Sequence, residues 1–153
     1  MTALIAQVMA SNSDMDTSVI SESDQITELL RTSKTIAVVG LTSDPMRPSN
    51  SVSEYMQSQG YRIIPVNPNE REVLGEKAYA TLADVPHKID LVNVFRRPEF
   101  VADVVRQAIE LKLPAIWLQE GVVDERAAQS ARHAGMIVVM DRCILKEHRR
   151  RRF

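Results

Sequence analysis

From Thr35 onward, short apolar runs alternate with longer segments in which apolar residues recur every three or four positions. The short runs are rich in β-branched residues and almost continuously apolar, which is typical of parallel strands that helices cover on both faces. Strands are expected at residues 35–40, 61–66, 89–95, 115–119 and 136–140.

The segments between these runs predict amphipathic helices. The first of them ends at Gly60, and the pair Ser51 and Glu54 predicts a capping box near its start. Further helices are expected at residues 98–112 and 124–134, with short ones from about residue 24 and about residue 141.

This alternation with short connections predicts an α/β fold, a doubly wound and mostly parallel sheet with helices on both faces. The sheet would have five strands, or six if the segment Glu76–Tyr79 adds a short edge strand. In such sheets, ligands lie at the carboxyl ends of the strands, beside the first strand. The residues that follow each strand are therefore the ones to inspect for a binding site.

The chain of 153 residues is long enough for one domain. Residues 1–24 are polar and acidic and predict a flexible N-terminal extension. Residues 25–148 contain the strands and helices, and residues 149–153 form a basic tail that is expected to be solvated. The tail could attract RNA, acidic lipids or a partner protein.

The overall charge and the cysteine count limit the possible functions. The net charge is −1, so nucleic acid is not expected as a partner, and no apolar run is long enough to span a membrane. The single cysteine, Cys143, excludes an internal disulfide and a multi-cysteine metal site. Together with the absence of a convincing signal peptide, these features predict a cytoplasmic protein.

The turn after the first strand is suited to an anionic ligand. It begins at Gly40, and the backbone amides and hydroxyls of Thr42 and Ser43 can donate to phosphate near the start of the following helix. Arg47 adds a positive charge. The alternative is an ordinary polar loop, since any α/β fold has a turn at this position.

A dinucleotide site is disfavoured at this turn. Such a site requires the pattern G-x-G-x-x-G, but only Gly40 is present, and Thr42 and Pro45 occupy the later glycine positions. The second strand ends at Asn67-Pro68, where an acidic residue would be expected to bind ribose. An NAD(P)-dependent oxidoreductase is therefore a less favoured alternative, and no phosphate-binding P-loop sequence occurs.

Two other strand ends carry candidate binding residues. Phe95 could pack on a base and Arg96 could pair with phosphate, although Phe95 also fits the core. Gln119 and Glu120 follow the fourth strand and precede Gly121, which allows an unusual turn. Trp117, within that strand, is expected in the core.

No catalytic or metal-binding set is evident. The three histidines, His87, His133 and His148, have no partners in sequence that suggest a site, so surface positions are expected for them. Cys143 lies near basic residues that could lower its pKa, but a partly buried and inert thiol fits equally well.

Five sequence blocks in this order resemble the small stand-alone CoA-binding proteins of the YccU type, which are similar to the CoA-binding domain of the succinyl-CoA synthetase α subunit. They are Val39-Gly-Leu-Thr-Ser-Asp-Pro-Met-Arg-Pro-Ser49, Gly60-Tyr-Arg-Ile-Ile-Pro-Val-Asn-Pro68, Ile89-Asp-Leu-Val-Asn-Val-Phe-Arg-Arg97, Trp117-Leu-Gln-Glu-Gly121 and Val138-Val-Met-Asp-Arg-Cys143. The resemblance covers about residues 25–148 and implies a Rossmann-like fold with coenzyme A (CoA) at the strand ends.

The resemblance also implies roles for individual residues. The loop beneath the cofactor's phosphates would contain Gly40, Thr42, Ser43, Asp44 and Arg47. Asn67 and Pro68 would border the adenosine, Val94, Phe95 and Arg96 would line the cleft, and Leu118, Gln119 and Glu120 would follow the pantetheine arm.

The chain departs from the synthetase in one implied contact, because Asn69-Glu70 stands where the synthetase has a lysine after the second strand. The catalytic phosphohistidine of the synthetase lies in a further domain that these residues do not include. The resemblance therefore does not imply ligase chemistry. The expected function is non-catalytic binding of CoA or acyl-CoA, as a carrier, sensor or regulatory module. The alternative is an enzyme or enzyme subunit that handles acyl-CoA. No protein partner is indicated.

Overall fold

The computed structural model describes residues 20–153, so most of the extension predicted for residues 1–24 lies outside the described residues. The chain divides into two units between Thr32 and Ser33. The first contains helix α2 (Glu22–Thr32), which begins two residues before the position expected from the sequence. Ile26, Leu29 and Leu30 share one side of α2, as their spacing predicts.

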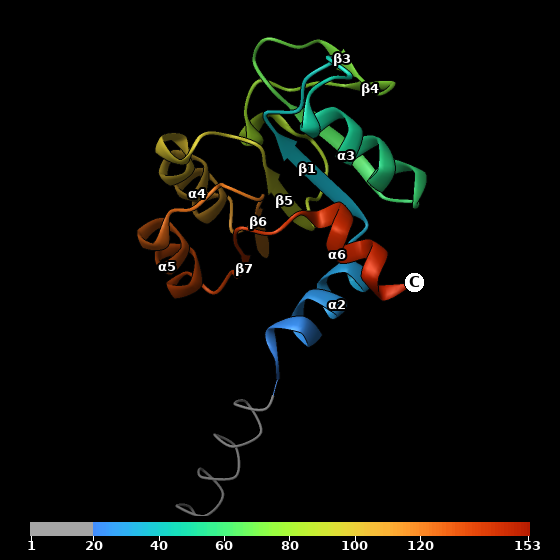
Figure 1. The fold of residues 1–153 in the computed structure, drawn as a ribbon. Coiled ribbons are helices and arrows are strands. Elements are labelled where there is room, and N and C mark those ends of the chain that lie inside the picture. The colour runs from blue at the N-terminus through green and yellow to red at the C-terminus, as the bar shows by residue number, and fades with distance from the viewer. Residues whose placement is uncertain (1–19) are drawn as a thin grey trace, which may run out of the picture. The chain divides into compact units, whose positions relative to one another are not determined.

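The second unit is built on a parallel sheet of five strands in the order β2-β1-β5-β6-β7 (Figure 1). Each predicted strand is present and slightly shorter than expected. Their bounds are β1 Thr35–Val39, β2 Arg62–Val66, β5 Leu91–Val94, β6 Ala115–Leu118 and β7 Ile137–Val139. The α/β, doubly wound, Rossmann-like class is thereby confirmed.

The predicted sixth strand does not join this sheet. β3 (Glu72–Val73) and β4 (Glu76–Lys77) form a separate antiparallel pair, and one bridge between Val66 and Tyr79 connects this region to β2. The segment therefore covers the edge of β2 as a small hairpin (Figure 1).

Helices cover both faces of the sheet. α4 (Val101–Glu110) and α5 (Glu125–His133) pack on one face, where their apolar residues share a core with Val92, Ile116 and Val138. α3 (Pro48–Ser58) and α6 (Ile144–Arg151) lie on the other face (Figure 1). Single 3-10 turns occur at Leu82–Asp84 and Pro98–Phe100.

The start of α3 differs from the sequence prediction. The helix begins at Pro48, with Arg47 as its N-cap residue, so the expected capping box of Ser51 and Glu54 does not form. Proline is favoured in the first turn because its missing N–H would have no helical partner there. The end at Gly60 is confirmed, since Gln59 caps the helix and Gly60 has a φ of 97°.

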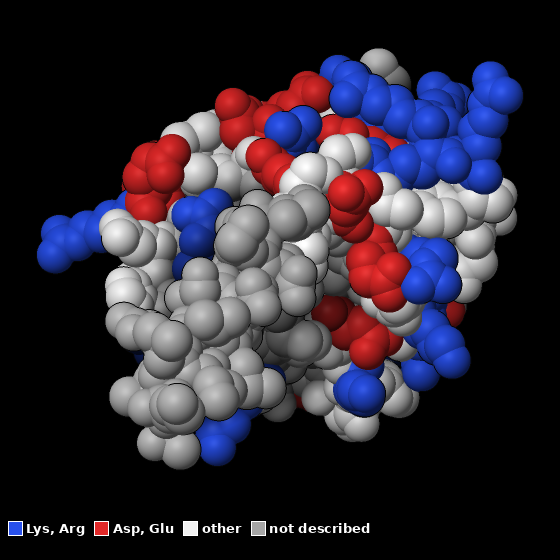
Figure 2. Space-filling view, turned by 90° about the horizontal axis from the view of Figure 1, so that it is seen from below, with Lys and Arg blue, Asp and Glu red and all other residues white. Residues whose placement is uncertain are grey.

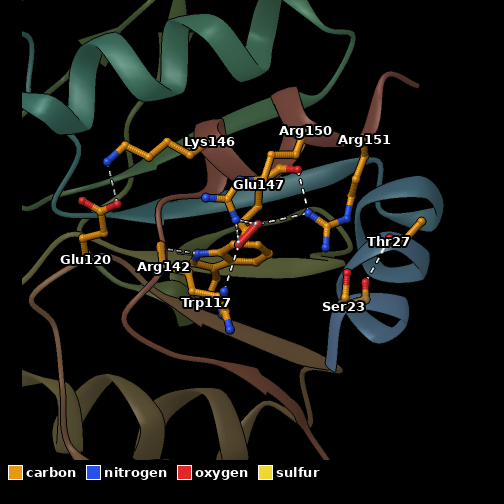
Figure 3. A network of polar contacts seen from close by, with 9 residues as sticks. All are labelled: Ser23, Thr27, Trp117, Glu120, Arg142, Lys146, Glu147, Arg150 and Arg151. Atoms are coloured by element: carbon orange, nitrogen blue, oxygen red, sulfur yellow. Dashed lines mark hydrogen bonds and ion pairs between the residues drawn. The ribbon is translucent and has the colours of Figure 1, made fainter. Parts of the chain in front are cut away.

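The basic tail is partly helical, because α6 extends to Arg151 and includes three of the tail's arginines. Lys and Arg side chains gather over the end of α6, on one side of the face shown in Figure 2. The buried carboxylate of Glu147 in α6 pairs with Arg150 and Arg151 of the same helix and with Arg142, which precedes it (Figure 3). The solvated tail expected from the sequence is therefore wrong for Arg151, whose side chain is only 11% exposed.

His148 also departs from the sequence prediction. It is buried, whereas a surface position was expected, because its ring packs against Tyr55, Tyr61 and Phe153. Trp117 is fully buried, as predicted. Within residues 20–153, no helix has the length and apolar character needed to cross a membrane.

Candidate functional site

The carboxyl ends of the three central strands lie side by side. In the register of the sheet, Val39 is paired with Val66 on one side and with Val94 on the other, and Val94 is paired with Leu118. The loops that follow β1, β2, β5 and β6 therefore meet at one edge of the sheet. This is the edge where the alternating strand pattern predicts a ligand.

Gly40 allows the ends of β1 and β5 to approach closely. Its φ is 88°, and a Cβ atom at this position would lie 2.2 Å from the carbonyl oxygen of Phe95. Any larger residue would therefore force apart the backbone of two strand ends that build the site. The role of Gly40 is therefore steric. Because it has no side chain, Phe95 and Arg96 can lie close to the β1–α3 loop.

Polar groups of the β1–α3 loop, residues 41–47, form hydrogen bonds with other groups of the protein. The amide of Thr42 donates to the hydroxyl of Ser49 across 3.3 Å, and the amide and hydroxyl of Ser43 both donate to Glu70 Oε1 across 3.3 and 3.1 Å. The amide of Met46 donates to Asp44 Oδ1 across 2.9 Å. An anionic ligand that used these amides would have to replace the protein's own acceptors.

A cavity of about 890 Å³ opens at this edge of the sheet. Its size falls within the range of small-molecule sites. Most of the residues predicted from the sequence line it, namely Gly40, Thr42, Arg47, Asn67, Phe95, Arg96, Gln119 and Glu120. They come from four different strand ends, so the topology of the sheet collects them.

A second cavity of about 250 Å³ adjoins the first. The two share Gly40, Asn67, Arg96 and Phe100, and Pro68 lines only the smaller one. Asn67 fixes this junction, because its side-chain amide donates to the carbonyl oxygen of Leu41 across 3.1 Å. The space at the strand ends is thus elongated, with a narrow part beside β2 and a wide part beside β6.

Four predicted residues lie elsewhere. Ser43 and Asp44 are exposed in the β1–α3 loop and line neither cavity. Val94 and Leu118 are fully buried, and their side chains belong to the core beneath α4 and α5. They can support the cavity from below, but their side chains do not reach it.

The structure adds residues that the sequence reasoning did not select. Asn69, Arg97 and Cys143 line the large cavity, and Phe100 lines both. Phe100 lies in the 3-10 turn after β5, and the guanidinium of Arg96 stacks over its ring at 4.3 Å. An aromatic residue six positions after the end of a strand is a weak signal, because aromatic residues that pack from a helix onto the core occur at similar positions.

The charge around the large cavity is predominantly positive. Arg47, Arg96 and Arg97 line it, while the carboxylate of Glu120 is paired with Lys146 across 2.8 Å. That hydrogen bond raises the pKa of Lys146. Arg47 lies 3.9 Å from Asp44, a long contact between two exposed groups. The guanidinium groups of Arg96 and Arg97 are therefore the strongest attraction for anions at this edge.

No group of three or more histidine, cysteine, aspartate or glutamate side chains suited to a metal ion occurs within residues 20–153. The cavity instead combines guanidinium groups, hydroxyls and amides with an aromatic ring. This composition, at the switch point of a doubly wound sheet, is typical of a binding site for a small anionic ligand in a Rossmann-like domain.

Comparison with known families narrows this class. Residues 34–149 match the family model described as the CoA binding domain, and the chain therefore belongs to that family. The resemblance inferred from the five sequence blocks is thus confirmed. The matched range contains all five strands of the sheet and both cavities.

The most similar relatives include small proteins and parts of larger ones. The uncharacterized protein YneT of Bacillus subtilis is 47% identical over 124 residues, which cover 81% of this chain and 92% of YneT. The α subunit of an ADP-forming acetate–CoA ligase II from Pyrococcus furiosus is 27% identical over 120 residues. That match covers 71% of this chain but only 26% of the ligase subunit.

Solved structures show the same fold. A protein from Pyrococcus horikoshii OT3 matches with a TM-score of 0.82 and 38% identity, covering 85% of this chain and 92% of the other. The structure of cell-free ID.343 from Thermus thermophilus matches with a TM-score of 0.81 and 37% identity, covering 85% and 98%.

Proposed function

We propose that this protein binds coenzyme A or an acyl-CoA in the elongated space at the strand ends, as a non-catalytic carrier, sensor or regulatory module. The observation that carries the proposal is the joint lining of that space by Arg47, Arg96 and Arg97 within a member of the CoA-binding domain family. CoA combines several phosphate charges with an adenine ring and a long, thiol-ended arm, so it requires cations, an aromatic surface and an extended cavity.

The division of the space suggests how such a ligand lies. The narrow part beside Pro68 and Phe100 suits the adenosine, and the guanidinium groups at its junction with the wide part suit the phosphates. The wide part continues past Gln119 and Glu120 to Cys143, which suits the pantetheine arm. In this arrangement Thr42, Ser43 and Asp44 form the loop beneath the phosphates, and Val94 and Leu118 support the cavity from the core.

The test is isothermal titration calorimetry with CoA on the wild type and on Arg47→Ala and Arg96→Ala. Charge-assisted hydrogen bonds are worth about 1.5–3 kcal/mol, so each substitution should weaken binding by about tenfold or more. Arg132→Ala, an exposed arginine in the last turn of α5, is the matched control and should bind like the wild type. No measurable binding of CoA at millimolar concentration to the wild type would end the proposal.

A second candidate is an enzyme subunit that handles acyl-CoA. The similarity to a ligase subunit of which this chain spans about a quarter favours it, because the matching domain could serve a separate catalytic chain. Incubation of the protein alone with acyl-CoA tests whether it has a catalytic activity of its own. The protein alone should leave a pure acyl-CoA unchanged under the first proposal, and consumption of acyl-CoA would favour the enzyme.

A further inference from the structure

Glu70 accepts hydrogen bonds from two donors of the β1–α3 loop, Ser43 N–H and Ser43 Oγ–H. A single carboxylate oxygen, Oε1, accepts both the backbone amide and the hydroxyl of Ser43. Two converging donors on one anionic oxygen are the arrangement expected around a phosphate oxygen at the start of a helix. The acceptor here comes from the protein itself, from a residue 27 positions further along the chain.

The position of Glu70 is set by the turn that follows β2. The amide of Glu70 donates to the carbonyl oxygen of Asn67 across 3.2 Å, and the amide of Asn69 donates to Asn67 Oδ1 across 2.9 Å. Asn67 also holds the carbonyl oxygen of Leu41. One asparagine therefore connects the turn that carries Glu70 to the loop that carries Ser43.

The contacts of Glu70 are well placed but replaceable. Distances of 3.3 and 3.1 Å are longer than those of strong charge-assisted hydrogen bonds, and Ser43 is exposed. Asp44 lies within the loop itself, 3.9 Å from Arg47. With Glu70 bound to it, the loop therefore has two carboxylates, Glu70 and Asp44, against the one cation Arg47, although Arg96 and Arg97 attract anions to the adjoining cavity.

We propose that Glu70 is a specificity-determining residue of this site, whose carboxylate competes with ligand phosphate for the two Ser43 donors. The inference rests on the proposed binding of CoA. In this structure Ser43 is held by Glu70 and does not line the cavity. A phosphate that reaches this loop displaces the carboxylate and is repelled by its charge, so the residue lowers the affinity for highly charged ligands.

The test compares CoA binding by calorimetry in the wild type, Glu70→Gln and Glu72→Gln. Glutamine can still accept the two Ser43 hydrogen bonds, so the loop stays braced while the negative charge is lost. Glu70→Gln should bind CoA more tightly, on the order of threefold to tenfold, and the gain should shrink at high salt. Glu72→Gln removes an exposed carboxylate two residues away on β3 and should leave the affinity unchanged.

Dephospho-CoA identifies the phosphate concerned. If Glu70→Gln raises the affinity less for dephospho-CoA than for CoA, the carboxylate repels the 3′-phosphate. If it raises both affinities equally, the carboxylate repels the pyrophosphate. Either result supports competition between Glu70 and a ligand phosphate. If the wild type binds CoA but Glu70→Gln binds it equally or more weakly, Glu70 only braces the loop and this inference is overturned, while the proposed function stands. If neither protein binds CoA, both proposals fall.

Discussion

The side-chain amide of Gln119 donates a hydrogen bond to Asn93 Oδ1 across 2.7 Å, and both residues are almost completely buried. Asn93 lies within β5 and is paired in register with Trp117 of β6. Gln119 follows β6 and lines the large cavity. This amide pair therefore connects the core of the sheet to the floor of the candidate site.

Removing both members of this pair should cost less than the sum of the costs of removing each one alone. In Asn93→Ala the buried Gln119 amide loses its acceptor, which should lower the free energy of unfolding by about 1–3 kcal/mol. In the double variant Asn93→Ala/Gln119→Ala no orphaned amide remains at this position, so its cost should be smaller than the sum of the single costs. Urea unfolding of all four proteins gives the coupling, and simple additivity would show that the hydrogen bond does not contribute.

Gly40→Ala should be far more damaging than alanine at another glycine of similar backbone conformation. Both Gly40 and Gly135 have positive φ, 88° and 89°. Alanine costs about 1–2 kcal/mol in this conformation, and at Gly135 no described heavy atom within 4 Å adds to that cost. At Gly40 the new methyl would meet Phe95 oxygen at 2.2 Å, so the backbone must move.

The measurement for the glycine pair is thermal and urea unfolding, together with CoA titration. Gly135→Ala should fold and keep its affinity for CoA. Gly40→Ala should either fail to accumulate as folded protein or unfold at much lower urea and bind CoA poorly. Equal stability of the two variants would contradict the steric role of Gly40.

The buried carboxylate of Glu147 should stabilise the fold in a pH-dependent way. Burial raises its pKa and is the largest single influence, but the hydrogen bonds from Arg151 and Arg142 and the charges of Arg150 and Arg151 together outweigh it, so the pKa is lowered. Figure 3 shows these guanidinium groups around the carboxylate. Glu147→Gln should therefore lower the free energy of unfolding at pH 7 by about 3 kcal/mol.

The sign of the pH effect follows from the lowered pKa of Glu147. Its stabilisation is fully present above the pKa of an unfolded glutamate, about 4.3, and is lost as the pH falls through the folded value. The difference between wild type and Glu147→Gln should thus be constant from pH 7 to about 5 and shrink below about 4. Glu110→Gln, which breaks an exposed ion pair with Arg106, should cost less than about 1 kcal/mol at any pH.

His148 gives a second pH dependence, in a higher range. Burial lowers its pKa, and its Nδ1 atom is 2.9 Å from the hydroxyl of Tyr55. The unfolded chain then binds a proton more readily than the folded protein, so stability should fall as the pH drops below about 6.5. His148→Gln should reduce this loss between pH 7.5 and 5.5 in urea unfolding. His133→Gln, at an exposed position in α5, should retain it.

The sequence predicted the sheet and the edge of the site because both depend on a repeated pattern. Five apolar runs separated by helices require parallel strands, and parallel strands place their carboxyl ends together. Gly40, Arg47 and Gln119 could thus be placed at one edge without any coordinates. Pro48 is itself a helix-start signal, and it competes in the sequence with the capping-box pattern of Ser51 and Glu54.

The details that were missed depend on contacts between distant residues. Whether Val94 and Leu118 face a cavity or the core depends on which face of the sheet each residue occupies, and continuous apolar runs do not reveal this. The contact of Glu70 with Ser43 joins two loops through the local turn at Asn67, and no spacing rule relates the two residues. The roles of the site residues toward CoA stay predictions until binding is measured.

Cys143 provides the last prediction, because its half-buried thiol lines the large cavity beside Gln119, Glu120 and Gly121. If the pantetheine arm follows this side of the cavity, its sulfur can reach the thiol. With CoA disulfide as the oxidant, the Cys143 thiolate attacks one sulfur, the bond between the two CoA sulfurs breaks, and one CoA leaves as a thiol. The intact mass of the wild type should then rise by one CoA less two hydrogen atoms, one from the Cys143 thiol and one from the CoA thiol, and reduction should reverse the gain. Cys143→Ser should show no gain, while a gain in that variant, or none in the wild type at saturating CoA disulfide, would refute the assignment.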